Sequence, residues 1–260
     1  MMEGLSGLSE VVPVSRLLDS EAGVLLSYPR FDPVVAEGRL EELGGLGVDA
    51  LVLRGRHTVG DVPVMGKGHV GVVVVALLGG EEVALKVRRV DADRASLDAE
   101  AGYLRLANGV SVGPIFRASS TNFLVMELVE GDYLVDWLGG LGSSEGGVLR
   151  GVLKRLLGKA RRLDVAGLDH GELSRADRHV IVSGGDPRIV DFESASTVRR
   201  CANVTSLAHY LFFNRRVSGL IGGVVPLPAR EELIGSLGGY RRGPSEGAFL
   251  GVLDVCGLSA

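Results

Sequence analysis

The sequence contains 260 residues, of which 46% are hydrophobic, and this length suits one large domain or two small lobes with a cleft between them. Its formal net charge of −4 gives no basic excess of the kind that marks nucleic-acid-binding proteins, so we expect no direct contact with nucleic acid. The two cysteines have the spacing of neither a disulfide framework nor a zinc site, the longest apolar run, residues 72–78, is too short to span a bilayer, and no signal-peptide pattern opens the chain. We therefore expect a cytoplasmic protein with no membrane partner.

Residues 10–47 carry a helical pattern. Over residues 10–47, leucines and valines recur at intervals typical of helices, the pattern is interrupted near Tyr28-Pro29, and Gly44 and Gly45 follow its last apolar position. We therefore predict two short helices before residue 48.

Strand-like segments follow from Asp49 onward. Runs rich in valine and leucine, such as VVVVALL and EEVALKV, are separated by glycines, and Gly79-Gly80 has the composition of a tight hairpin turn. We predict three or four antiparallel strands joined by tight turns.

The rest of the chain mixes helices with short strands. Residues 93–109 place apolar side chains at helical intervals and end at Asn108-Gly109, a composition typical of a helix C-cap. After this helix the patterns predict strands over 114–120, 121–129, 179–182 and 187–190, a helix near 147–164, and two to four helices after Ser194. The predicted fold class is α+β.

A glycine-rich segment, GKGHVG at residues 66–71, lies between two strand-like runs. Because the chain contains 39 glycines, a G-x-G-x-x-G spacing can arise by chance, and an ordinary turn is one interpretation. The segment joins two strands and not a strand and a helix, so a dinucleotide-binding fold is disfavoured. The functional interpretation is a hairpin whose backbone amides close over a phosphate chain.

Lys86 lies within an apolar run, VALKV, and its interpretation depends on Glu100. Considered alone, Lys86 could belong to the solvent-facing side of a strand, together with Ala84 and Arg88. Glu100 lies three residues after Leu97 and so shares the apolar face of its predicted helix. The alternative is that Glu100 lies at the edge of this face, with its carboxylate in water. Burying a carboxylate alone is costly, whereas a lysine from the neighbouring strand would keep both groups charged, so we predict that the two residues form an ion pair.

The segment MELVEG, residues 126–131, lies where an apolar strand ends. A connection between two lobes at 127–131 would offer free backbone groups to the edge of a flat aromatic ring. A strand that simply leaves a core has the same pattern.

The polar loop HGELSRADRH contains His170, Glu172, Asp177 and His179 within ten residues. A solvated loop is one interpretation. The second is functional, because Asp191 ends a nearby apolar strand in RIVDFE and its carboxylate can point into a cleft. Carboxylates from neighbouring loop ends make a site for a hard cation, of which Mg²⁺ is the natural candidate.

Taken in order, the motifs G-x-G-x-x-G-x-V, V-A-L-K, a helical Glu, M-E-L, H-G-E-L and D-F-E occur between residues 60 and 195. This order and spacing resemble the protein-kinase superfamily, in particular the atypical archaeal serine/threonine kinases similar to RIO-type and tRNA-modification-complex kinases. The resemblance implies a protein-kinase-like bilobal fold. Residues 59–128 would form an antiparallel-sheet N-lobe with one long helix, and 129–260 a reduced, mostly helical C-lobe. Residues 1–58 lie outside the resemblance, and we expect them to form a helical extension packed on the N-lobe.

The resemblance also implies ATP and Mg²⁺ as cofactors and assigns the site residues. Lys86, paired with Glu100, would hold the α- and β-phosphates, and Glu172 would stand where a kinase aspartate orients the attacking hydroxyl. Asp191 and Asp177 would bind the metal, with His179 as the alternative to Asp177. The ATP-binding residues would be Gly66, Gly68, Gly71, Val73, Ala84, Lys86, Glu127 and Leu128.

The chain departs from the kinase pattern in three places. Glu172 replaces the usual aspartate and is one methylene longer, Glu193 replaces the glycine of D-F-G, and no A-P-E motif follows. The change at Glu193 argues against the backbone flip of regulated kinases, and the missing A-P-E argues against peptide recognition of the eukaryotic kind.

These patterns lead us to expect an ATP-dependent phosphotransferase that moves the γ-phosphate of ATP to a Ser or Thr hydroxyl of a protein substrate or of the chain itself. A small-molecule kinase, an ATPase of an RNA-related assembly and a nucleotide-binding pseudokinase scaffold are the alternatives. We also expect Lys86→Ala to abolish phosphotransfer with the fold intact, on the premise that Glu100 borders a solvent-filled cleft and can be rehydrated.

Overall fold

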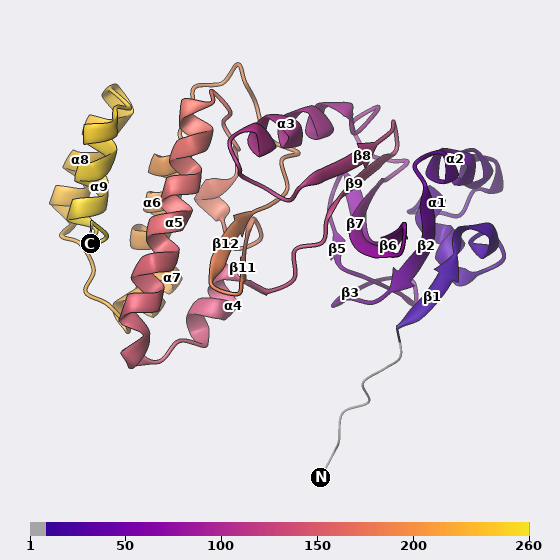
Figure 1. Cartoon of the computed structure of the whole chain (residues 1–260), viewed down its shortest axis with the longest axis horizontal. Coiled ribbons are helices and arrows are strands. Elements are labelled where there is room, and N and C mark those ends of the chain that lie inside the picture. Colours follow the sequence, from indigo (N-terminus) through magenta and orange to yellow (C-terminus); the bar gives the residue numbers. More distant parts are fainter. Residues whose placement is uncertain (1–8, 260) are drawn as a thin grey trace, which may run out of the picture. The chain divides into compact units, whose positions relative to one another are not determined.

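The computed structural model describes residues 9–259, and the chain divides into two compact units (Figure 1). Unit 1 consists of Met1–Ala101 and Ile115–Leu128, and unit 2 of Gly102–Pro114 and Val129–Ala260. Both antiparallel sheets and helices are present, so the predicted α+β class is confirmed.

The main sheet of unit 1 is antiparallel throughout. Its strands follow the order β1-β2-β6-β7-β9-β8, with β5 paired to β6 outside this path, and β3 and β4 form a separate hairpin. The strand bounds are β1 Glu10–Pro13, β2 Val48–Leu53, β3 His57–Val59, β4 Val62–Val64, β5 Gly66–Lys67, β6 Gly71–Leu78, β7 Glu81–Arg88, β8 Phe116–Ser119 and β9 Phe123–Glu127.

The longest hairpin joins β6 to β7 through Gly79 and Gly80. Their φ angles are 58° and 83°, a left-handed conformation that glycine adopts without strain and that matches the twist of the flanking strands. The predicted hairpin is confirmed. Between residues 48 and 88 the structure forms six strands, β2 to β7, where three or four were expected.

The first helix expected within residues 10–47 is largely replaced by other structure. Residues 10–13 form β1, and they are followed by two short 3-10 turns, Val14–Arg16 and Glu21–Gly23, and by the single-turn helix α1, Val24–Ser27. The helical expectation is wrong for residues 10–13 because they pair with β2, a contact with residues 50–53 that local spacing does not report.

The second helix of this region forms as predicted and is α2, Pro33–Gly45. Asp32 caps its start, since Oδ1 of Asp32 accepts the backbone N–H groups of Val34 and Val35 at 3.0 and 3.2 Å. Pro33 occupies the first helical position, where its missing N–H leaves no hydrogen bond unmade.

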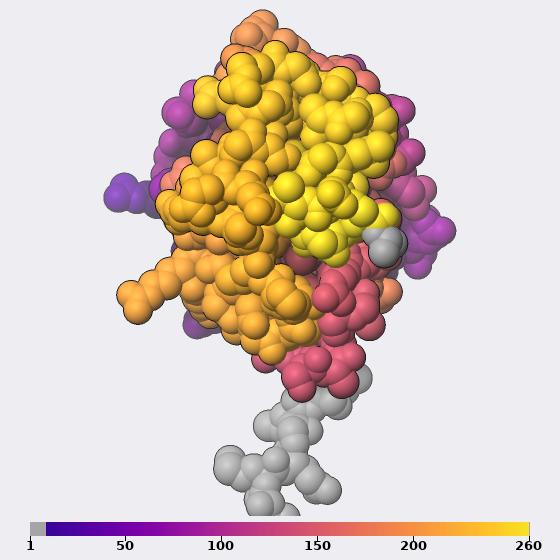
Figure 2. Space-filling view, turned by 90° about the vertical axis from the view of Figure 1, so that its left-hand side faces the viewer, coloured from indigo at the N-terminus to yellow at the C-terminus, as the bar shows by residue number. Residues whose placement is uncertain are grey.

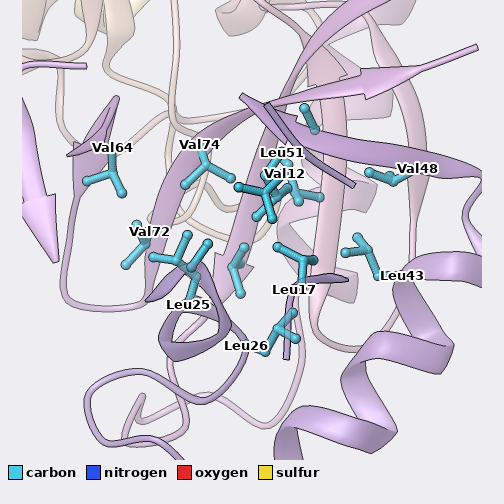
Figure 3. Packing of buried hydrophobic residues seen from close by; sticks show 14 of the residues in the cluster. Val12, Leu17, Leu25, Leu26, Leu43, Val48, Leu51, Val64, Val72 and Val74 are labelled. Carbon is cyan, nitrogen blue, oxygen red and sulfur yellow. The ribbon is translucent and has the colours of Figure 1, made fainter. Parts of the chain in front are cut away.

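The apolar core of unit 1 joins this N-terminal region to the sheet. Figure 3 shows part of the cluster, in which the buried side chains include Val12, Leu17, Leu25, Leu26, Leu43, Leu51, Val72 and Val74. Full burial of one such side chain contributes roughly 1.5–3 kcal/mol. Residues 12–43 are therefore an integral part of unit 1, whose sheet begins before residue 59.

Unit 2 is mostly helical and carries one small antiparallel sheet of order β10-β11-β12. Its predicted strands and helices form close to their predicted places, and helix α3 begins in unit 1 and continues into unit 2. The bounds are α3 Asp98–Gly109, β10 Asp132–Tyr133, α4 Leu134–Gly139, α5 Gly146–Val165, β11 Val180–Ser183, β12 Asp186–Ile189, α6 Asn203–Phe213, α7 Arg215–Gly222, α8 Arg230–Arg242 and α9 Glu246–Val255, with 3-10 turns at Ser143–Glu145 and Leu173–Arg175.

Helix α5 forms part of the core of unit 2. One face of the helix is buried, and the buried Lys159 reaches β12, where its Nζ donates to both carboxylate oxygens of Asp186 and to the Pro187 carbonyl at 2.7–2.8 Å. The last two helices, α8 and α9, contact each other and form the yellow surface in Figure 2. Among the described residues, we find no helix with both the length and the apolar character that a membrane span requires.

Candidate functional site

The candidate residues fall into two groups, one in each unit. The group in unit 1 contains the glycine hairpin and the pair Lys86 and Glu100, and the group in unit 2 contains Glu172 and Asp191. Each group is held by elements of its own unit.

Lys86 and Glu100 form a buried ion pair in unit 1. The Lys86 Nζ donates to Oε1 of Glu100 at 2.8 Å, and the two side chains are only 5% and 4% exposed. Lys86 lies in the middle of β7, between its partners on β6 and β9, and Glu100 lies in the first turn of α3. The predicted pair is confirmed, and the two solvent-facing alternatives are wrong.

As a contact between a strand and a helix, this ion pair carries a large desolvation cost. Moving each charge out of water costs several kcal/mol, and apolar side chains of similar volume would stabilise the same contact as well or better. The pairing therefore keeps a lysine charged in a buried position, which is a property that an anionic ligand could use and that stability alone does not require.

The glycine hairpin packs directly against this lysine. Gly66 and Gly71 lie on the paired strands β5 and β6, and the Gly68 N–H donates to the Gly71 carbonyl at 2.8 Å, so the predicted hairpin is confirmed. A Cβ atom at Gly71 would lie 2.8 Å from the Val87 carbonyl oxygen and 3.1–3.2 Å from side-chain carbons of Lys86. Glycine at position 71 therefore allows β6 to approach the aliphatic stem of Lys86.

The other ATP-binding candidates of unit 1 lie on neighbouring strands. Val73 is opposite the lysine in the β6–β7 register, and Ala84 of β7 is 6% exposed. Glu127 ends β9, where its backbone N–H donates to the Ile115 carbonyl at 2.8 Å and its carboxylate accepts the Ile115 N–H at 2.9 Å. A ligand bound at this edge would have to use backbone groups other than the Glu127 N–H. Leu128, the last residue of unit 1, is half-buried.

His170 is a fully buried histidine of unit 2. Its Nε2 lies 3.1 Å from the Val190 carbonyl, which can only accept a hydrogen bond, so Nε2 carries the proton. Nδ1 has no hydrogen-bond partner within residues 9–259. The ring contacts Phe192 and His179, with centroid distances of 5.0 and 5.5 Å, and burial, together with the nearby His179, lowers the pKa of His170 to about 4. The expectation of a solvated loop is therefore wrong for His170 and for the buried His179.

Acid should destabilise the chain through His170. Because its pKa in the folded state is about 4 and its ordinary value is 6.5, His170 contributes stability above pH 6.5 that is lost as the pH falls toward 4. The full difference corresponds to roughly 3 kcal/mol. In His170→Gln the amide can still donate to the Val190 carbonyl but does not titrate, so this part of the loss should disappear. Urea unfolding at several pH values between 7 and 4 measures the effect.

A second histidine serves as the control for this experiment. His209 on α6 is exposed, so His209→Gln should retain the acid sensitivity of the parent chain. Equal acid sensitivity of His170→Gln and the parent would contradict the assignment.

Glu172 has a donor on each carboxylate oxygen. Oε2 lies 2.7 Å from His179 Nε2, and Oε1 accepts a hydrogen bond from Ser194 Oγ at 3.1 Å. Ser194 is itself held in place, because the Arg199 side chain donates to its carbonyl at 2.9 Å. The Glu172 side chain is still 25% exposed, and a carboxylate offers about four lone-pair sites, so an oriented group remains able to accept a proton.

Asp191 follows β12 in a conformation that is uncommon for residues other than glycine. Its φ angle of 66° lies in the left-handed region, where a side chain costs about 1–3 kcal/mol and where strain clusters at functional sites. A carboxylate oxygen of Asp191 lies within 4.8 Å of one from Glu193, and Oδ2 of Asp191 is 3.9 Å from His179 Nδ1. Two carboxylates so close together offer the hard oxygen ligands that Mg²⁺ prefers.

Asp177, the other predicted metal ligand, does not join this group. It is exposed in the turn before β11, where its charge adds to burial in raising the pKa of Tyr210 to about 12. His179 instead lies beside both Glu172 and Asp191. The preference for Asp177 over His179 is corrected here, because it relied on a fixed offset along the loop, whereas the turn continues for two residues beyond Asp177 before β11 begins.

Glu193 and Ser194 are the residues of this group that the sequence analysis did not select as site residues. The available signal was the D-x-E spacing, which places two carboxylates only two residues apart. Phe192 between them packs inward at 2% exposure, as expected for the apolar residue of this segment.

No family model matches the chain, and a search of curated proteins also finds no match. The case for a function therefore depends on the two groups of residues and on their chemistry.

Proposed function

We propose that the chain is an ATP- and Mg²⁺-dependent phosphotransferase of the protein-kinase-like fold, which transfers the γ-phosphate of ATP to a serine or threonine hydroxyl of a protein or of the chain itself. In this proposal residues 59–128 act as the N-lobe, residues 129–260 as a reduced C-lobe, and residues 1–58 extend the N-lobe.

The buried Lys86–Glu100 pair is the observation that carries this proposal. Glu100 keeps the lysine charged and fixes its direction, and a compact ammonium is well suited to bind phosphate oxygens. The adjoining hairpin has no side chain at Gly66, Gly68 or Gly71, so its backbone can approach a phosphate chain closely. These features fit ATP.

The group in unit 2 fits the remaining tasks. Asp191 and Glu193 would hold Mg²⁺, whose charge offsets that of the phosphates. Glu172 would take the proton of the acceptor hydroxyl while the hydroxyl oxygen bonds to the γ-phosphorus and the bond from that phosphorus to the ADP oxygen breaks. His179 and Ser194 would keep Glu172 in one orientation during this transfer.

Incubation of the purified chain with γ-labelled ATP, Mg²⁺ and a mixture of unlabelled proteins tests the proposal. Label on a protein or on the chain itself supports it, whereas label on a small molecule or free phosphate identifies another acceptor. If the chain neither transfers label nor shows any Mg²⁺-dependent change in melting temperature with ATP, the proposal fails.

A nucleotide-binding scaffold without turnover is the second candidate function. The bonding of Glu172 favours it, because both carboxylate oxygens already have donors and a carboxylate with a purely positioning role would have the same contacts. The ATP-binding features of unit 1 are common to both candidates, so a variant at Glu172 separates them.

We expect Glu172→Gln to lower the rate of phosphotransfer by about 10²–10⁴-fold, because an amide cannot take the hydroxyl proton. The ATP-induced shift in melting temperature should stay the same as in the parent chain. Glu231→Gln, the same change at an exposed position of α8, is the control and should transfer phosphate at the parental rate. A scaffold would show an ATP-induced shift, no transfer in the parent chain and no effect of either substitution.

A further inference from the structure

An open depression in unit 1 combines basic and apolar side chains. It lies between α2 and the end of β7, and its volume is about 410 Å³. Its lining includes Val34, Val35, Arg39, Arg88, Val90 and Asn122. None of these residues takes part in the phosphotransfer proposed above, so the inference drawn from this depression does not depend on that function.

Arg39 is the buried charge of this depression and is only 3% exposed. Its Nη1 donates to the Leu26 carbonyl at 2.9 Å and to the Arg88 carbonyl at 2.6 Å, and its Nη2 donates to Oδ1 of Asn122 at 2.9 Å. Burial, together with the neighbouring Arg88 charge, lowers the pKa of Arg39 to about 10. The protein therefore holds a guanidinium here against an electrostatic cost.

The second guanidinium shares the same acceptor. Nε and Nη2 of Arg88 donate to Oδ1 of Asn122 at 3.0 and 2.8 Å, so two cations converge on one neutral oxygen. The only carboxylate that lines the depression among the described residues is Glu42, and it accepts the backbone and side-chain N–H groups of Asn122, each at 2.7 Å. Two positive charges therefore face one negative charge.

Both guanidinium groups have donor capacity left. Each Nη2 carries two hydrogens, one of which is used by Asn122, and the hydrogen bonds of residues 9–259 include no acceptor for the second. The two Nη2 atoms lie within 3 Å of the same oxygen, so they are close enough for one further acceptor to bridge them. An oxyanion is the acceptor that would also balance the excess charge.

We propose that this depression binds a small oxyanion with a short apolar group, an organic carboxylate or phosphate, whose oxygen bridges the guanidinium groups of Arg39 and Arg88. The apolar group would cover Val34 and Val90, which are 78% and 40% exposed. Removing these two valines from water would add to the affinity.

The test uses two probes, inorganic phosphate and isovalerate, each titrated into the full chain in a chloride buffer without nucleotide. The side-chain Nε–H signals of Arg39 and Arg88 are followed by NMR, and saturable shifts of both signals are expected. Saturation with phosphate, with isovalerate or with both supports an oxyanion site, and tighter binding of isovalerate would support the apolar contribution of the valines.

Two variants locate the site. Arg88→Gln removes one guanidinium, and Val34→Glu places a negative charge at the rim on an exposed position of a helix N-terminus, where a glutamate does not disturb folding. Each should weaken binding at least about tenfold, since each loses or opposes a charge-assisted contact. Val11→Glu, the same change at a half-exposed valine of β1, should bind as the parent does.

The proposal is overturned if neither probe gives saturable shifts, or if Arg88→Gln and Val34→Glu bind with the parental affinity. Loss of phosphotransfer in any variant has no bearing on this outcome, because binding is read directly from the arginine signals.

Discussion

Replacing Lys86 alone by methionine should destabilise the chain by about 3–5 kcal/mol, because it leaves a buried carboxylate without its counter-ion. Glu100 is 4% exposed and its Oε1 accepts from the Lys86 Nζ, so the premise that Glu100 borders a solvent-filled cleft and can be rehydrated is wrong. Without that premise, we expect Lys86→Ala to lose stability as well. The free energy of unfolding in urea measures this loss.

The double variant Lys86→Met/Glu100→Leu should recover most of this stability, because it replaces both charges by apolar side chains of similar volume. It should not recover activity. If the lysine binds the phosphates of ATP, the single and the double variant should both transfer phosphate at least about 10²–10³-fold more slowly than the parent. Stability and activity are thereby separated at one contact.

Lys154→Met is the matched control, since Lys154 lies on α5 of unit 2 with a part-exposed side chain. It should unfold at nearly the same urea concentration as the parent and transfer phosphate at the same rate. Two results would contradict the argument. One is an unchanged stability of Lys86→Met, and the other is parental phosphotransfer by the double variant.

Asp191→Asn should remove most of the Mg²⁺ dependence of ATP binding while the chain stays folded. Asparagine has the same size as aspartate and tolerates the left-handed backbone found at position 191, so the substitution changes the charge and little else. With one anionic ligand lost, we expect the affinity gained from Mg²⁺ to fall about tenfold or more, because cation affinity follows ligand charge. Melting temperatures with ATP and Mg²⁺, compared with ATP and a chelator, measure the change.

Two further substitutions show whether the charge of Asp191 or its backbone conformation is responsible for the Mg²⁺ effect. Asp191→Ala should lose the Mg²⁺ effect and also be less stable, because alanine is less easily accommodated at a φ angle of 66°. Asp254→Asn, an exposed aspartate on α9, should behave as the parent. An undiminished Mg²⁺ effect in Asp191→Asn would remove Asp191 from the metal site.

The contact between Lys86 and Glu100 shows what local sequence patterns can predict. The alternation of β7 by itself left a solvent-facing lysine open. The helical period of α3 placed Glu100 on an apolar face, and the cost of burying a lone charge predicted that it would pair with Lys86. The distance of 2.8 Å and the near-complete burial confirm this. The hairpin turn at Gly79 and Gly80 was predictable for a similar reason, since the left-handed backbone it needs favours glycine.

The errors came where distant segments compete with local preference. The apolar spacing of residues 10–13 is compatible with a helix, but their pairing with β2 makes them a strand. The neighbourhood of Asp191 likewise depends on the path of the loop before β11, which brings His179 to the site and leaves Asp177 in solvent. The network of Arg39, Arg88 and Asn122 could not be foreseen, because it joins residues up to 83 positions apart.

The sequence by itself determined the α+β class, most of the element positions after residue 48, and the pairing of a lysine with a glutamate in unit 1. These features follow from the side-chain periods of strands and helices, about two and 3.6 residues, and from the free-energy cost of burying a charge. Both effects act within short segments or between adjoining elements. Only the tertiary structure decided that Glu100 is sealed from water, that Glu172 is bonded on both oxygens, and that two arginines meet at one amide. Burial and hydrogen bonding between distant residues depend on how the whole chain packs, and no local pattern contains that information.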